Sequence, residues 1–143
     1  MGKLGFGRRH GLCMAAVFLI VLLFAAGCGG KETAEDKVRD LEFTLVGQND
    51  LPQELREIIE EKKKEPFRLT FSNGADLYIA AGYGEQESGG YSIAVPELYL
   101  AENSIVVRTE LQGPEQGEAA GTGASYPFAV MRTELIEKPV VFR

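Results

Sequence analysis

From residue 67 to the end of the chain, apolar and polar residues alternate in short runs, which is the pattern of half-buried β-strands. Turn-forming residues at 72–74 and 102–103 separate some of these runs. Strands are expected around residues 67–71, 77–80, 91–95, 98–100, 105–111, 126–130 and 140–142, with an earlier one at 41–45.

One segment has the 3.6-residue period of an amphipathic helix, with an apolar stripe at Leu51, Leu55, Ile58 and Ile59. Asp50 is expected to cap it, with Pro52 in the first turn and Gln53 completing a capping box. Pro66 ends it, because the residue before proline avoids the helical region. The lysines at 62–64 either complement the helix dipole or form a patch for a membrane surface.

Together these patterns predict a mainly β (α+β) domain over residues 41–143. Its architecture is expected to be an antiparallel sheet or sandwich-like fold with one amphipathic helix near its N-terminus. Residues 28–40 are polar and show no periodicity, so they are expected to be a flexible tether.

The first 27 residues have the composition of a secretory signal peptide. Basic residues at positions 3, 8 and 9 precede an uncharged apolar run at 11–26, and small residues at 25–27 precede Cys28. This ending resembles a bacterial lipobox, which implies cleavage between Gly27 and Cys28 and a diacylglyceryl group on the Cys28 sulfur. The protein is then anchored to the membrane outside the cytoplasm. Alternatively, the apolar run stays as an uncleaved anchor, or Cys28 is an ordinary thiol.

Composition narrows the chemistry that the exported chain can perform. With 15 Lys and Arg against 21 Asp and Glu, the net charge is −6, which argues against a nucleic-acid partner. His10 and Cys13 lie in the signal segment, so nucleophilic sites that need imidazole and metal sites built from His and Cys are not expected. We therefore predict no cofactor, no metal and no catalytic residue. The catalytic arrangements still open are a Ser-Lys dyad and a pair of carboxylates, as in a glycan hydrolase.

The glycine-rich stretch at residues 82–90 does not match a nucleotide-binding loop. Glu87 occupies the place of the third glycine of that motif, and no lysine follows Gly90. The stretch is expected to connect strands, with glycine supplying positive φ, and to expose a loop that can bind another protein. Tyr83, Tyr91 and Tyr126 are the nearest aromatic residues.

Two short motifs follow in order behind the lipobox: Ser88, Gly89, Gly90, Tyr91 and Ser92, and then Ser125, Tyr126 and Pro127. Together they resemble the C-terminal domain of the PrcB family over about residues 76–142. Thr often precedes the paired glycines in that pattern, where this chain has Ser88.

The resemblance implies a membrane-anchored accessory subunit that binds and stabilises or regulates an extracytoplasmic protease without catalysis of its own. The motif residues are then either contacts for the protease or parts of the framework. An alternative is a protease inhibitor acting through its glycine-rich loops. The chagasin-like inhibitors carry a comparable loop, although this chain lacks their tryptophan.

Overall fold

The computed structural model describes residues 36–115 and 122–143. Residues Glu35–Arg143 form one compact unit. The signal peptide and the cleavage and lipid sites at Gly27 and Cys28 lie outside the described residues, so these assignments stay predictions.

The first sheet has four strands in the order β1-β6-β7-β10. Its strands are β1 (Lys37–Asp40), β6 (Ser92–Ala101), β7 (Ile105–Gln112) and β10 (Val140–Phe142). β6 pairs antiparallel with both β1 and β7, whereas β10 pairs parallel to β7. The last strand is thus an exception to the antiparallel pattern expected from the sequence.

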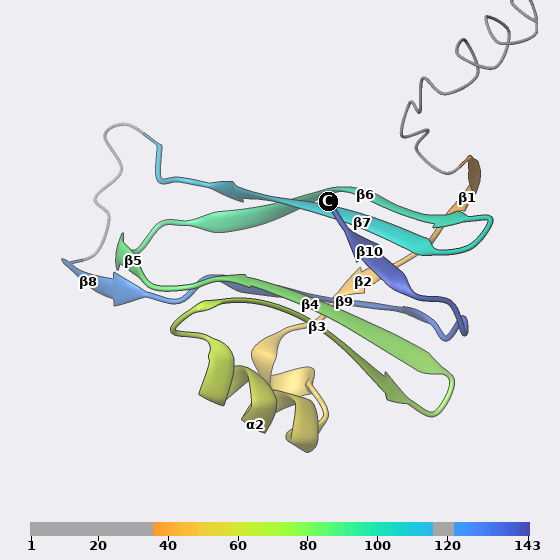
Figure 1. Ribbon diagram of the computed structural model, residues 1–143. Helices are drawn as coiled ribbons and strands as arrows, with labels where there is room; N and C mark the ends of the chain where they lie inside the picture. Colours follow the sequence, from red (N-terminus) through yellow and green to blue (C-terminus); the bar gives the residue numbers. More distant parts are fainter. Residues whose placement is uncertain (1–35, 116–121) are drawn as a thin grey trace, which may run out of the picture. The chain divides into compact units, whose positions relative to one another are not determined.

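The second sheet has four antiparallel strands in the order β2-β9-β4-β3. They are β2 (Thr44–Leu45), β9 (Phe128–Glu134), β4 (Asp76–Tyr83) and β3 (Pro66–Asn73). Figure 1 shows the two sheets facing one another, with helix α2 (Gln53–Lys62) on the outer side of the second sheet. The expected sandwich-like, mainly β fold with one amphipathic helix is confirmed.

The two faces of the second sheet bury two separate apolar clusters, because side chains alternate along each strand. The inner cluster lies between the sheets and consists of Leu41, Leu77, Ile79, Leu98, Ile105, Val107 and Met131. The outer cluster lies under the helix and consists of Leu51, Leu55, Ile59, Tyr78, Ala80 and Val130. The stripe predicted for the helix is therefore the face that packs on the sheet, and Ile58 is half-buried beside it.

The start of the helix differs from the predicted capping box. Asp50 belongs to a short 3-10 helix, η1 (Gln48–Asp50), and its N–H donates to the carbonyl of Gly47 at 3.0 Å. The N-cap of α2 is Pro52, and no side chain caps the helix. The extra turn separates Asp50 from the first helical N–H groups, so the predicted cap is wrong.

Strand β1 lies within the segment that was expected to be a tether. Its four residues are all exposed and show no alternation, which is why the sequence pattern gave no strand signal there. It nevertheless pairs with β6, and Arg39 forms an ion pair of 2.6 Å with Glu134 of β9. The sheet thus begins before residue 41.

Candidate functional site

The two motif segments lie next to each other at one end of the sandwich. Strand β5 (Gln86–Ser88) ends in the first motif, and β8 (Thr122–Ser125) ends in the second. The two strands form a small antiparallel sheet, in which Gln86 is opposite Ser125. Figure 1 shows this sheet at the end of the domain where β6 begins and β7 ends, so we call it the motif end.

A hydrogen bond joins the two motifs directly. The Ser125 hydroxyl donates to the carbonyl oxygen of Ser88 at 2.5 Å. The Ser88 hydroxyl in turn donates to the carbonyl of Gly89 at 3.3 Å. Both serines are half-buried, and both hydroxyls have main-chain partners; that of Ser125 holds the two loops together.

The paired glycines allow a close approach to the loop after β7. Gly90 has φ 86°, and a Cβ at this position would lie 2.9 Å from the Cβ of Pro114. Tyr91 is half-buried beside Gly113, whose own Cβ would lie 3.7 Å from the tyrosine ring. The expectation that glycine supplies positive φ in this connection is confirmed at Gly90 and also at Gly84, where φ is 75°.

Tyr126 connects the second motif to the end of the helix. Its hydroxyl donates to a carboxylate oxygen of Glu85 at 3.3 Å, and the Lys63 ammonium lies 5.6 Å from its ring centroid. Lys63 also forms an ion pair of 2.7 Å with Glu60, one turn earlier in the helix. The helix-end interpretation of the lysine cluster therefore accounts for Lys63.

Pro127 and Tyr83 connect the motif end to the sandwich. The N–H of Tyr83 donates to the carbonyl of Pro127 at 3.1 Å. The Tyr83 and Thr109 hydroxyls lie 2.7 Å apart and share a hydrogen bond between β4 and β7. The motif end is thus attached to both sheets.

Among the motif residues, Gly90 and Ser92 are exposed and the other six are half-buried. The Ser92 hydroxyl lies 3.5 Å from Oε1 of Gln112, which is a long contact. The contacts described above hold most of the motif residues within the fold, whereas Gly90 and Ser92 are its exposed residues.

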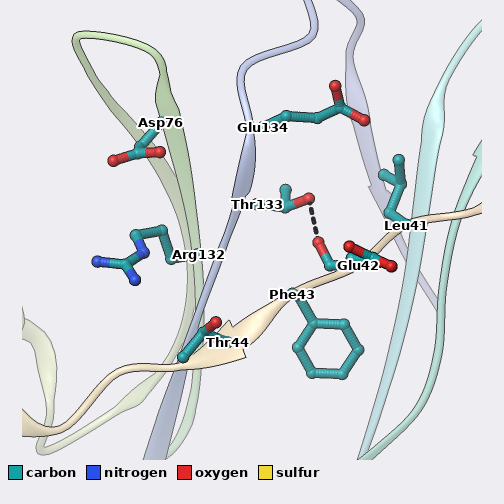
Figure 2. Close-up of a pocket in the computed structure, with 8 residues that line it drawn as sticks. All are labelled: Leu41, Glu42, Phe43, Thr44, Asp76, Arg132, Thr133 and Glu134. Carbon is teal, nitrogen blue, oxygen red and sulfur yellow. Dashed lines mark hydrogen bonds between the residues drawn. The ribbon is translucent and has the colours of Figure 1, made fainter.

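A separate depression of about 600 Å³ is lined by residues from β2, β4 and β9 and from the segment before β2. Figure 2 shows that the carboxylates of Glu42, Asp76 and Glu134 do not converge on a common point. Glu134 is paired with Arg39, and Thr133 donates to the main-chain carbonyl of Glu42 at 2.8 Å. This arrangement does not assemble the facing acid pair that carboxylate catalysis requires.

A second opening, of about 350 Å³, lies beside the motif end and between the two sheets. It is lined by Pro66, Phe67, Arg68, Ala81, Gly82, Tyr83 and Thr109. Arg68 is the only charged side chain among them, so the opening favours an anionic group.

The described ranges 36–115 and 122–143 contain neither a cluster of metal-ligating side chains nor a helix that could cross a membrane. No group of three or more His, Cys, Asp or Glu side chains there is arranged to hold a metal ion. No helix in the same ranges has the length and apolar character needed to cross a membrane.

The sequence located the motifs but missed their partners. Lys63, Glu85 and Thr109 support the motif end, yet all three lie outside the two motifs. Only the pair of glycines indicated, from the sequence alone, that another part of the chain approaches the loop closely.

The family model described as PrcB C-terminal matches residues 77–134. No curated protein and no solved structure matches the chain. The matched region runs from β4 to the end of β9, so it includes both motifs and the strands between them. The resemblance seen in the sequence is confirmed, since residues 77–134 of this chain match the model of the PrcB C-terminal family.

Proposed function

We propose that this protein is a non-catalytic subunit of a protease complex in the cell envelope, where it binds the protease and stabilises or regulates it. The observation that carries the proposal is the family match over residues 77–134, which contains both motifs. The hydrogen bond between Ser125 and Ser88 supports it, because it makes the two motifs one structural unit.

The side chains present in the exported part of the chain support a role in binding. From residue 29 onward the sequence contains neither histidine nor cysteine. The carboxylates around the larger depression point in different directions (Figure 2). Within the motifs, the Ser88 and Ser125 hydroxyls donate to the main-chain carbonyls of Gly89 and Ser88.

The proposal includes a membrane anchor. Cleavage before Cys28 and acylation of its sulfur would tether the β-rich domain to the outer surface of the cell membrane. A tethered subunit meets a membrane-bound or newly exported protease at high effective concentration, which compensates for a modest contact area.

Affinity purification of the intact lipoprotein from solubilised membranes tests this function. We expect a protease or its precursor to be recovered with it, in an amount that scales with the bait. A Cys28→Ala chain is the matched control, because it has the same domain and lacks the acylated sulfur; its recovery of the protease should fall. Absence of any protease from the wild-type preparation would contradict the proposal.

Inhibition is a second candidate, favoured by the exposed residues Gly90 and Ser92 in the loop beside Gly113 and Pro114. An inhibitor lowers the activity of the recovered protease when added at equal concentration. A stabilising subunit leaves the initial rate unchanged and lengthens the lifetime of the protease. One activity time course therefore separates the two.

A further inference from the structure

The outer edge of strand β7 is only partly covered. β10 pairs with residues 105–107, and the N–H of Arg143 donates to the carbonyl of Val107 at 2.9 Å. β7 continues to Gln112, and its only strand neighbours in the described part of the chain are β6 and β10. Residues 108–112 therefore present an open strand edge on the side where β10 ends.

The main-chain groups at this edge can be assigned from the alternation along the strand. The N–H of Ile105 donates to the carbonyl of Pro139, and the carbonyl of Val107 accepts from the N–H of Arg143. The main-chain N–H and C=O groups of the odd-numbered residues of β7 therefore point toward β10. Thr109 and Leu111 therefore direct their N–H and C=O groups to the open edge. A five-residue edge spans about 17 Å, which accommodates a strand of ordinary length.

The open edge borders the 350 Å³ opening between the sheets, because Thr109 belongs to both. That volume is near the lower limit of about 300 Å³ for ligand pockets. The guanidinium carbon of Arg68 lies 5.7 Å from the ring centroid of Phe142, at the end of β10. Arg68 of the second sheet therefore lies close to the end of β10, where the edge of β7 is no longer paired.

Arg68 has no carboxylate partner among the ion pairs of the described residues. By contrast, Arg108 of β7 pairs with both Glu97 and Glu110. A strand added beside β7 would direct alternate side chains into the opening toward Arg68. An acidic side chain at such a position would form a charge-assisted contact with the guanidinium.

We propose that residues 108–112 bind an extended segment of a partner protein as an added strand, and that Arg68 selects an Asp or Glu in that segment. This rests on the proposed function, in which the partner is the protease or its precursor. Main-chain hydrogen bonds hold the segment, and the opening supplies its specificity. A second copy of this chain fits less well, because symmetric pairing of the two edges would bring two Arg68 side chains together.

Synthetic decapeptides test the charge preference. The probe is an alternating Thr-Val peptide with Glu, Gln or Lys at its centre, titrated against the full chain in detergent and followed by fluorescence anisotropy. We expect the Glu peptide to bind about tenfold more tightly than the Lys peptide, equivalent to one charged contact. Arg68→Gln should remove the preference. Arg132→Gln, at an exposed arginine of the other depression, should retain it.

A pair of variants at one position tests the edge. Thr109→Pro and Thr109→Val both lose the side-chain hydrogen bond with Tyr83, and only the proline removes the N–H that faces the open edge. We expect proline to weaken peptide binding more than tenfold and valine to change it less than twofold. Slower hydrogen exchange of the Thr109 and Leu111 amides in the wild-type chain with bound peptide gives the same information without a variant.

Equal binding of the Glu and Lys peptides, or unchanged amide exchange, would overturn the proposal. The proposal would also be overturned if the wild-type chain formed a dimer and Thr109→Pro dissociated it, because a second copy of the chain would then occupy the edge. If affinity purification recovers the protease equally with a folded Thr109→Pro chain, the edge proposal fails and the proposed function stands. If the Glu peptide binds as expected and no protease is recovered, the proposed function fails and the edge remains a peptide-binding site.

Discussion

The Ser125 hydroxyl donates a hydrogen bond of 2.5 Å to the main-chain carbonyl of Ser88, a residue 37 positions earlier in the chain. This contact joins the two motifs of the family at one end of the sandwich. It also gives a structural role to the Ser125 side chain, for which the sequence left both a structural role and a binding role open.

Ser125→Ala should loosen the motif end without unfolding the sandwich. It removes the donor and leaves the Ser88 carbonyl without that partner, at a cost of about 1 kcal/mol in the free energy of unfolding. Hydrogen exchange should accelerate at β5 and β8 and stay unchanged in β4. Ser92→Ala is the control, since its hydroxyl is exposed and makes only a contact of 3.5 Å. Equal exchange rates in both variants would refute the assigned role.

Gly90→Ala and Gly74→Ala separate backbone strain from crowding. Both glycines have positive φ, 86° and 63°, so alanine costs about 1–2 kcal/mol at either position. A Cβ at Gly74 meets nothing within 4 Å, whereas one at Gly90 lies 2.9 Å from Pro114. Urea denaturation should therefore show the larger loss of stability for Gly90→Ala. A larger loss for Gly74→Ala would mean that the two loops are not in close contact.

The hydrogen bond between Tyr83 and Thr109 should couple the two sheets. Tyr83→Phe and Thr109→Val should each lower the free energy of unfolding by about 1 kcal/mol. Because both remove the same bond, the double variant should lose less than the sum of the single losses. Additive losses in a double-mutant cycle would show that the hydroxyls act independently.

Leu55→Ala should be among the most damaging single changes in the helix. Leu55 of α2 is fully buried against the second sheet, and such truncations cost about 2–5 kcal/mol. Leu45→Ala provides the comparison, since Leu45 is 56% exposed and should change stability by less than about 0.5 kcal/mol. Similar denaturation midpoints for the two variants would contradict the assigned packing of the helix.

Cys28→Ala should abolish the proposed lipid anchor. We expect mass spectrometry to find the wild-type chain beginning at an acylated Cys28, and the variant as an uncleaved or misrouted precursor. A wild-type product of lipid-free mass would contradict the anchor while leaving the fold unaffected.

The sequence predicted the elements whose signal is local. Leu51, Leu55 and Ile59 revealed the buried face of the helix because the 3.6-residue period depends only on their spacing. Strand β1 gave no such signal, since all four of its residues are exposed. Asp50 had the chemistry of a cap, but the 3-10 turn moved it away from the helix start.

Long-range pairing was beyond the sequence pattern. Nothing near Val140 indicates that β10 runs parallel to β7, because that register depends on a partner 35 residues away at Ile105. At the candidate site, the motifs identified Ser88 and Ser125 as important. Their mutual contact and the support from Lys63 become apparent only once β5 pairs with β8.

Site-specific crosslinking in membranes tests the central claim most directly. A photoreactive residue replaces Glu87, an exposed position of β5 at the motif end, or Glu137, an exposed position in the segment between β9 and β10. We predict that illumination joins the chain to a protease from position 87 and gives little or no adduct from position 137. Absence of a protease adduct from position 87, with the lipoprotein present at its normal level, would contradict the claim.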